Sequence, residues 1–488
     1  MKISLVLWVL SFICLIVTLF MIFPLGLALL DGTADARAFA LSLVCGLLLS
    51  LLLFLVGKSQ GRERDALGIR EALGVVGFAW VIASAVGALP YWSSGTTPSY
   101  VDAFFETMSG FTTTGATILT NIEASPRGVL LWRALTHWIG GMGIIVLSLA
   151  VLPFLGIGGI ELYKAEVPGV TAEKLTPRLH QTALLLWGTY VLLTFVETAL
   201  LMFGGLGIFD AFAHSCATIA TGGFSTKNAS IAHFNSPYVE WVVTLFMFLS
   251  GVNFSLYFLL FARRARNFFR DEELRWYASI ALASSLAMAL SLYAGGLVSG
   301  LEPTLRRCAF HVVSVMTTTG FVTEDYNLWP EFARFLFILL MIIGASGGST
   351  GGGCKVARFL LVGRQLRAET IRQIHPRAIV TARVNGRPVP QATMDSAVSF
   401  LILYALLLFM ATLAVTAFSV PGLDVLGAFS GVVTCLSNVG PGLNALGPVE
   451  NFAWLPDGVK WIFSFLMLAG RLELFAVVLL FLPDTWVR

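Results

Sequence analysis

Charged residues are scarce in this chain. They make up 12% of its 488 residues, whereas a soluble domain typically has about 25%. Hydrophobic residues make up 57%. This composition excludes a soluble globular protein and predicts an integral membrane protein. The net charge of +3 comes without a basic soluble face, so nucleic-acid binding is not expected.

Cysteine and histidine are also few, and neither is arranged to bind a metal. The six cysteines contain no Cys-x-x-Cys pair, which predicts buried thiols and excludes a disulfide framework or a zinc site. The six histidines lack ligand spacing, so we interpret His214 and His311 as packing or hydrogen-bonding residues. We find no paired carboxylates, metal cluster or activated nucleophile, so an enzyme is not expected.

Long apolar runs are abundant. Ten of them have roughly 20 residues, the length that a helix needs to cross a hydrocarbon core about 30 Å thick. The first run is longer than the core of a signal peptide, so we interpret it as a membrane span. The predicted spans are 5–30, 38–56, 72–89, 129–155, 182–203, 239–261, 276–297, 332–362, 396–418 and 459–482.

Four shorter apolar stretches lie between these spans, and each ends in a small-residue turn with a glycine. The glycines follow one another at intervals of 107, 98 and 120 residues, which leaves room for two spans and one short stretch per repeat. Because non-helical backbone cannot face lipid, the turns predict re-entrant loops that line a cavity or water. The glycines, with a phenylalanine ten or eleven residues before each, are Gly115 (Phe105), Gly222 (Phe212), Gly320 (Phe310) and Gly440 (Phe429).

Turns of this kind offer what a dehydrated monovalent cation needs. Rings of backbone carbonyls can replace its hydration shell, and glycine permits the backbone angles that turn successive carbonyls inward. Threonine adds hydroxyl oxygens or packs the turn, and the short helices direct their partially negative C-terminal ends at the ion. The predicted filter residues are Thr113, Thr114, Gly115, Ala220, Thr221, Gly222, Thr318, Thr319, Gly320, Asn438, Val439 and Gly440.

An acidic residue stands near the start of each short helix. Aspartate favours helix N-caps and acids suit the first turn, so capping is our interpretation, and it is compatible with gathering cations at the outer mouth. The four acids are Asp102, Asp210, Glu302 and Asp424.

Glycine is concentrated a second time, in the predicted span 332–362. Six glycines lie between residues 344 and 353, and together they would cost a helix on the order of 6 kcal/mol relative to alanine. The span is therefore predicted to break there. Close helix packing by small residues is the alternative. A phosphate-binding loop is excluded, because Cys354 stands where that motif requires lysine.

An arginine, Arg471, lies midway in the last predicted span. Placing it there costs roughly 2.5–3.5 kcal/mol, so it should face the protein interior or a wet cavity. A structural ion pair with Glu197 in the fifth span is one interpretation.

Basic residues predict the orientation. Four connections, one after every second predicted span, are rich in basic residues. Together with Lys2 and Arg488, they hold 22 of the 31 lysines and arginines. By the positive-inside rule both termini are cytoplasmic, and the short stretches enter from outside. The connections contribute Lys58, Arg62, Arg64 and Arg70; Lys164, Lys174 and Arg178; Arg263, Arg264, Arg266, Arg270 and Arg275; and Lys355, Arg358, Arg364, Arg367, Arg372, Arg377, Arg383 and Arg387.

Taken together, these motifs resemble the Trk/Ktr/HKT superfamily of potassium transporters, most closely its TrkH type, and the similarity runs over the whole chain. The segments that carry it are Ser109-Gly110-Phe111-Thr112-Thr113-Thr114-Gly115-Ala116-Thr117, Ala220-Thr221-Gly222-Gly223-Phe224-Ser225, Met316-Thr317-Thr318-Thr319-Gly320-Phe321, Gly440-Pro441-Gly442-Leu443, Gly347-Gly348-Ser349-Thr350-Gly351-Gly352-Gly353-Cys354-Lys355 and His375-Pro376.

The resemblance implies an all-α membrane protein with four pseudo-symmetric membrane-pore-membrane repeats around one pore, plus an N-terminal pair of helices. It implies potassium uptake across a bacterial inner membrane. In this family a serine in place of the first filter glycine tends to go with sodium, so Gly115 favours potassium. The fourth turn departs from the threonine-rich pattern, so the fourfold symmetry is expected to be approximate. The implied divisions are 1–70, 71–165, 166–265, 266–370 and 371–488.

A gate and partners are also implied by the resemblance. The glycine-rich run would form a loop under the filter that gates the pore, with Arg471 beside it opposing cation passage. The gate residues are Gly347, Gly348, Ser349, Thr350, Gly351, Gly352, Gly353, Lys355 and Arg471.

The expected assembly is a homodimer whose basic cytoplasmic connection, 355–387, contacts anionic lipid or a cytosolic regulator. Separate TrkA-type subunits would bind the nucleotide, since this chain has no nucleotide motif or bound cofactor of its own, and potassium is its substrate. A transporter that couples potassium to protons or sodium is the alternative function.

Overall fold

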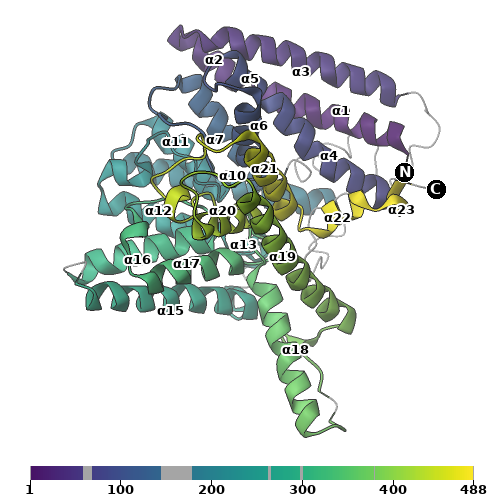
Figure 1. Ribbon diagram of the computed structural model, residues 1–488, viewed down its shortest axis with the longest axis vertical. Helices are drawn as coiled ribbons and strands as arrows, with labels where there is room; N and C mark the ends of the chain where they lie inside the picture. Colours follow the sequence, from purple (N-terminus) through teal and green to yellow (C-terminus); the bar gives the residue numbers. More distant parts are fainter. Residues whose placement is uncertain are drawn as a thin grey trace.

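The computed structural model describes residues 2–58, 69–143, 179–261, 265–296, 300–378 and 380–486. As predicted, the protein is an all-α membrane protein. Helices pack side by side through most of the molecule (Figure 1). In the described residues the only strands are the two-residue β1 (Arg383–Val384) and β2 (Arg387–Pro388), which form an antiparallel hairpin.

The N-terminal helices lie together along one edge of the molecule (Figure 1). The first predicted span forms α1 (Ile3–Phe20) and α2 (Ile22–Asp31), and the second forms α3 (Asp35–Gly57). A Cβ on Gly46 of α3 would lie 2.3 Å from the hydroxyl oxygen of Thr18, so the small residue allows α1 and α3 to approach closely.

The rest of the chain repeats one plan four times: a long helix, a short helix that we call the pore helix, and a second helix. The three helices of each repeat are α4 (Ile69–Gly87), α6 (Tyr100–Phe111) and α7 (Arg127–Gly141); α10 (Leu179–Phe203), α11 (Ile208–Ile219) and α12 (Pro237–Ser250); α15 (Glu272–Ala294), α16 (Leu301–Met316) and α17 (Glu331–Ile343); and α19 (Gln391–Ala417), α20 (Val425–Ser437) and α21 (Asp457–Arg471). The elements between and after them are α5 (Leu89–Ser93), η2 (Ser230–Phe234), α13 (Phe254–Phe261), α14 (Ala265–Phe268), η3 (Tyr326–Leu328), α18 (Val356–Ile374), η4 (Asn444–Leu446), α22 (Phe475–Phe481) and α23 (Pro483–Trp486). The divisions at 71, 166, 266 and 371 stay a prediction.

The pore helices are too short to cross a membrane. They have 12 to 16 residues, roughly 18–24 Å of helix. Capping by the acids is confirmed for Asp424, whose side chain accepts from the amide of Gly427 at 2.9 Å. The other three acids lie in the first turn instead, and in α6 the cap is Ser99.

The second helix of each repeat stops or bends partway along its length. The break predicted from glycine is confirmed: α17 ends at Ile343 and α18 begins at Val356. Two other predicted spans, 239–261 and 459–482, are not continuous, because α12 meets α13 at 98° and α21 meets α22 at 117°. At the second bend Glu473 and Leu474 have φ angles of 53° and 56°, which no helix accommodates.

These breaks change the number of continuous spans. Of the ten predicted, six are helices long enough to cross a membrane within the described residues, and the two bent pairs bring the total to eight. The other two begin as α7 and α17. The end of the predicted span 129–155, from residue 144 on, and the basic residues Arg62, Arg64, Lys164, Lys174, Arg178, Arg263, Arg264 and Arg488 lie outside the described residues.

Glycine lets the second helices approach the ends of the pore helices. A Cβ on Gly140 of α7 would lie 1.9 Å from the carbonyl oxygen of Phe111, and one on Gly470 of α21 would lie 2.0 Å from that of Leu436. Both oxygens belong to the last turn of a pore helix. Any side chain at these two glycines would push the pore helix away from the second helix.

Replacing Gly140 with alanine should therefore destabilise the protein by about 1–3 kcal/mol, the usual effect of overpacking a core. The measurement is the thermal unfolding midpoint of the purified protein in detergent. Gly188→Ala is the matched control, because Gly188 is also helical but has nothing within 4 Å of its would-be Cβ. Equal midpoints for the two variants would contradict the close approach.

Candidate functional site

The turns after the four pore helices share one backbone conformation. In each, a residue with left-handed φ is followed two positions later by a glycine with positive φ. The pairs, with their φ angles, are Thr113 and Gly115 (54° and 81°), Thr221 and Gly223 (54° and 78°), Thr318 and Gly320 (60° and 78°), and Asn438 and Gly440 (57° and 105°).

This conformation corrects the register of the second turn. Gly223, not Gly222, occupies the place of Gly115, and Ala220 ends its pore helix as Thr112 does in the first repeat. Two consecutive glycines stand in this turn, and either can adopt a positive φ. The sequence alone therefore could not distinguish between the two.

The four turns face one another in a closed ring. A Cβ on each positive-φ glycine would overlap the carbonyl oxygen of the residue before the corresponding glycine in the next repeat. The contacts are Gly115 with Gly222 (2.1 Å), Gly223 with Thr319 (2.0 Å), Gly320 with Val439 (2.1 Å) and Gly440 with Thr114 (2.7 Å). We call the oxygens of Thr114, Gly222, Thr319 and Val439 the carbonyl ring. The longest of these Cβ-to-oxygen distances joins repeats 4 and 1.

Threonine hydroxyls stabilise the turns through contacts with the pore helix and with one another. Thr112 donates to the carbonyl of Met108 at 2.6 Å, and its hydroxyl lies 2.8 Å from that of Thr114. Thr317 and Thr319 make the equivalent 2.8 Å contact in the third repeat. Of the two roles predicted for threonine, packing of the turn is thus the one that these hydroxyls perform.

A buried polar side chain of each pore helix holds the segment that leaves the turn. Glu106, His214 and His311 stand seven residues before the left-handed residue of their repeats. Ile118 donates its amide to Glu106 at 2.9 Å, the hydroxyl of Ser225 lies 2.8 Å from Nε2 of His214, and Thr323 donates to His311 at 3.3 Å. In the fourth repeat Ser430 accepts from the amide of Leu443 at 2.9 Å.

The predicted hydrogen-bonding role of His214 and His311 is therefore confirmed. Among the described residues no group of three or more histidines, cysteines or acids could hold a metal ion.

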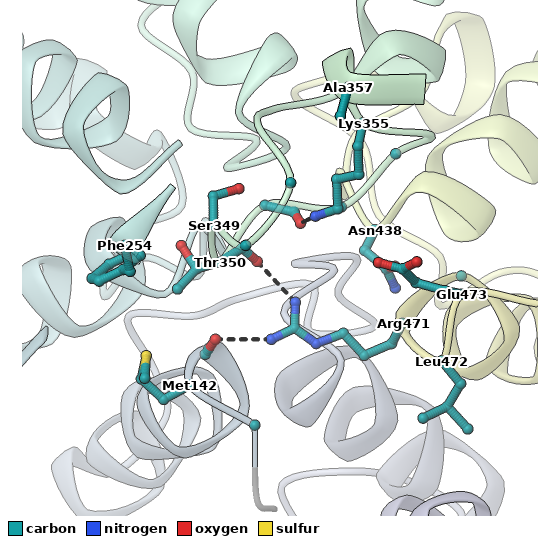
Figure 2. A pocket seen from close by; sticks show the side chains of 18 of the residues that line it. Met142, Phe254, Ser349, Thr350, Lys355, Ala357, Asn438, Arg471, Leu472 and Glu473 are labelled. Atoms are coloured by element: carbon teal, nitrogen blue, oxygen red, sulfur yellow. Dashed lines mark hydrogen bonds between the residues drawn. The ribbon is translucent and has the colours of Figure 1, made fainter. Parts of the chain in front are cut away.

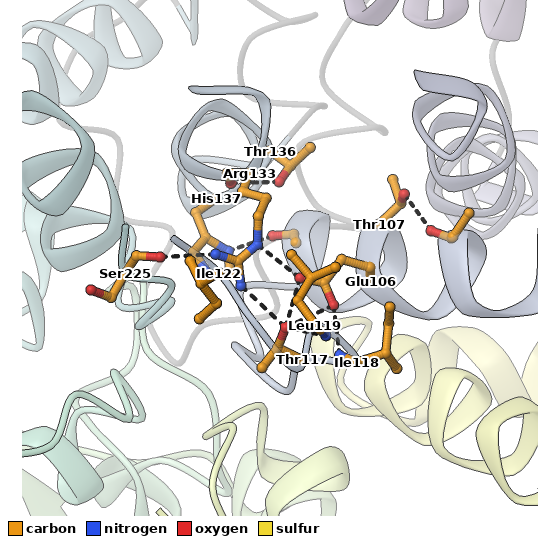
Figure 3. Close-up of polar contacts among 12 residues, drawn as sticks. Glu106, Thr107, Thr117, Ile118, Leu119, Ile122, Arg133, Thr136, His137 and Ser225 are labelled. Carbon is orange, nitrogen blue, oxygen red and sulfur yellow. Dashed lines mark hydrogen bonds and ion pairs between the residues drawn. The ribbon is translucent and has the colours of Figure 1, made fainter. Parts of the chain in front are cut away.

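A buried ion pair of repeat 1 lies beside the ring, and its arginine also reaches repeat 2 (Figure 3). Arg133 of α7 donates to Glu106 at 2.8 Å, and the two side chains are 2% and 0% exposed. The same guanidinium donates to the carbonyl of Ser225 in repeat 2 and to the hydroxyl of Thr117. Sequence reasoning missed this pair, although an arginine within a predicted span was the signal that identified Arg471.

The break between α17 and α18 forms a loop, residues 344–355, which we call the intramembrane loop. It contacts the C-terminal ends of three pore helices. Thr350 donates to the carbonyl of Ile219 at 3.0 Å, Gly352 donates to the hydroxyl of Thr318 at 2.6 Å, and Gly353 donates to the carbonyl of Ser437 at 3.0 Å. The intramembrane loop therefore lies directly under the carbonyl ring.

Arg471 and this loop line the same cavity (Figure 2). Its guanidinium donates to the carbonyl oxygen of Thr350 at 2.8 Å and to those of Gly140 and Gly141 at 2.5 and 3.0 Å. The cavity has a volume of about 160 Å³. Among the described residues the carboxylate of Glu197 has no hydrogen-bond partner, so the ion pair considered from the sequence is not formed.

Side chains also hold the intramembrane loop. The amide of Gly347 donates to Glu273 of α15 at 2.5 Å, and the ammonium of Lys355 donates back to the carbonyl of Gly351. Just beyond the loop, Arg358 of α18 pairs with Glu473 at the bend after α21. The loop is thus anchored by elements of repeats 3 and 4.

Short pore helices, a ring of turns and a loop beneath it are the features of a membrane transport protein with re-entrant loops. A family model described as TrkH, a cation transport protein, matches residues 46–486. The chain belongs to this family, as its motifs predicted.

The relatives are similar over nearly their whole length. The Trk system potassium uptake protein TrkH of Salmonella typhimurium is 39% identical over 469 residues, 96% of this chain and 95% of that protein. TrkH of Halomonas elongata is 37% identical and covers 100% of both chains. The crystal structure of the potassium transporter TrkH from Vibrio parahaemolyticus superposes with a TM-score of 0.88 at 33% identity and covers 100% of both chains.

Removing the arginine of the buried pair should destabilise the protein strongly. Arg133→Met leaves the carboxylate of Glu106 buried without its cation, an effect of about 3–5 kcal/mol in comparable pairs. The thermal unfolding midpoint measures it. The control is Arg127→Met in the same helix, because the side chain of Arg127 is 51% exposed and its pair with Asp31 should contribute about 1 kcal/mol or less. Similar losses in both variants would argue against a structural role for the buried pair.

Proposed function

We propose that this chain takes up potassium across the bacterial inner membrane through a gated, channel-like pore. The observation that carries the proposal is the closed carbonyl ring. Four backbone oxygens from four repeats lie around one centre, an arrangement that can replace the hydration shell of a cation without a fixed charge that would trap it. In the corrected register the proposed filter is Thr113–Gly115, Thr221–Gly223, Thr318–Gly320 and Asn438–Gly440.

Potassium is the proposed ion for two reasons. The relatives are named as potassium uptake proteins and are similar over nearly their full length. The first turn also retains Gly115, where a serine would place a hydroxyl against the ring. The fourth turn has Asn438 and Val439 in place of threonines, so the discrimination against sodium should be weaker than in a pore with four identical turns.

The intramembrane loop is the proposed gate. It lies under the ring, and Arg471 fixes it to the first repeat by donating to Thr350 on one side and to Gly140 and Gly141 on the other. A positive charge at this depth opposes a cation that leaves the ring. Opening would require the contacts of Thr350, Gly352 and Gly353 with the pore helices to break together.

The proposed orientation places both termini in the cytoplasm, together with α18. This helix projects from the body of the molecule (Figure 1) and begins where the intramembrane loop ends. A force on α18 would therefore reach the loop directly. We propose that nucleotide-binding regulatory subunits of the TrkA type dock on this face of a homodimer, and that anionic lipid contacts the basic residues beside it.

Ion flux into proteoliposomes that hold this protein alone tests the filter. Gly115→Ser should raise the sodium-to-potassium flux ratio several-fold, because its side chain would displace the carbonyl of Gly222, which lies 2.1 Å from the would-be Cβ. The matched control is Gly95→Ser. Gly95 also has a positive φ but has nothing within 4 Å, so this variant carries the same backbone strain away from the ring. A raised ratio in both variants, or in neither, would count against the filter.

The same liposomes test the gate. Arg471→Ala should increase potassium flux several-fold, because it removes both the positive charge and the link between the intramembrane loop and repeat 1. Arg471→Lys keeps the charge but cannot bridge the same acceptors, so it separates the two effects. Unchanged flux in both variants would refute the gating role of Arg471.

A coupled transporter remains the second candidate, and one observation favours it. The carboxylate of Glu197 is fully buried in the C-terminal third of α10, and intramembrane acids often mark ion or proton pathways. A coupled mechanism requires flux to depend on a proton or sodium gradient and Glu197→Gln to abolish that dependence. Passive potassium flux that ignores both gradients would exclude it.

A further inference from the structure

The junction between repeats 4 and 1 differs from the other three. The chain itself connects repeats 1 to 2, 2 to 3 and 3 to 4, whereas repeat 4 meets repeat 1 only through non-covalent contacts. A ring made from a single polypeptide therefore depends on those contacts for its closure. A Cβ built on Gly440 would lie 2.7 Å from the carbonyl oxygen of Thr114, against 2.0–2.1 Å for the corresponding pairs at the other three junctions.

A buried ion pair lies at this junction. The ammonium of Lys460 in α21 donates to Asp102 of α6 at 2.6 Å, and the two side chains are 5% and 7% exposed. The other carboxylate oxygen of Asp102 accepts from the hydroxyl of Ser99 at 2.8 Å, and Ser99 caps the same helix. The pair thus fixes the start of the first pore helix to the second helix of the last repeat.

The position of Lys460 recurs in the other repeats. Glu240, Arg334 and Lys460 are each the fourth residue after the N-cap of their second helix, and each reaches into the next repeat. Glu240 pairs with Arg306 of the third pore helix, and Arg334 donates to Asn444 of the fourth repeat. In the first repeat Arg133 crosses to repeat 2 in a similar way, from a position one turn later. A polar contact therefore crosses every junction.

At the inner end of the same junction the turns themselves meet. Asn438 donates to the hydroxyl of Thr114 at 3.0 Å and to the carbonyl of Met467 in α21 at 2.9 Å. Helices α6 and α21 are thus held together twice, by Asp102 and Lys460 at the outer end and by Asn438 beside the carbonyl ring. The separation of the two helices sets how closely Thr114 and Val439 approach.

We propose that the Asp102–Lys460 pair is a positioning element, the clasp, which sets the width of the carbonyl ring between repeats 4 and 1 and thereby its discrimination between potassium and sodium. The inference rests on the proposed function, because it assigns selectivity to a contact outside the filter. Neither residue need touch the ion. A ring that opens at its one unlinked junction admits ions of different size less strictly.

The test compares two readouts on the purified full chain: the sodium-to-potassium flux ratio in proteoliposomes and the thermal unfolding midpoint in detergent. Lys460→Met and Asp102→Asn should each lower the midpoint, because each leaves one buried charge uncompensated. Each should also raise the flux ratio several-fold. In the double variant the midpoint should recover, since no uncompensated charge is left, while the ratio should stay raised because the clasp is missing.

Two further variants complete the design. Lys460→Arg preserves the pair and should keep the ratio of the parent protein. Asp457→Asn removes an exposed acid from the first turn of the same helix and should change neither readout. A parent-like ratio in both single variants would overturn the proposal. So would a ratio that recovers together with the midpoint in the double variant, because the pair would then be merely structural.

Failure of the proposed function gives a different result. A parent protein without potassium-selective flux would overturn the proposed function, and the selectivity role of the clasp with it. If the changes in midpoint caused by the substitutions at positions 102 and 460 are not additive, the pair still closes the junction. Additive changes would show that the two residues do not stabilise each other and would overturn the clasp as well.

Discussion

Non-helical backbone inside a membrane must be satisfied by protein or water, and the structure depends on how this chain meets that constraint. The four pore helices end inside the protein. The turns that follow them pack against one another, against the second helices and against the intramembrane loop. Positions 140 and 470 require glycine, because the carbonyls of Phe111 and Leu436 leave no room for a side chain.

The sequence predicted those features that local chemistry decides. Glycine-rich turns after short apolar stretches identified the four re-entrant segments, and the cost of glycine to a helix identified the break that became residues 344–355. The register of the second turn was wrong because Gly222 and Gly223 are equally permissive. The bends after α12 and α21 were not predicted. Leu474 adopts a φ of 56°, a conformation that a leucine does not predict.

Pairing between residues far apart in the chain was also beyond the sequence. Glu106 and Arg133 are 27 residues apart, and Asp102 and Lys460 are 358 apart, so no helical or strand periodicity relates them. Each charge taken alone is an unfavourable residue in an apolar segment. A charged residue within a predicted span therefore indicates that a partner exists, but only the tertiary structure identifies it.

Because a single chain forms this ring, its four junctions can differ from one another, which those of four identical subunits cannot. Each junction can carry its own polar contact: a guanidinium on a carbonyl between repeats 1 and 2, an ion pair between repeats 2 and 3, an arginine on an asparagine between repeats 3 and 4, and a buried pair between repeats 4 and 1. The same freedom allows the second helix of repeat 3 to be opened into the intramembrane loop. Arg471 then has acceptors in repeats 1 and 3, so a movement of that loop changes contacts on both sides of the ring without requiring the other repeats to move.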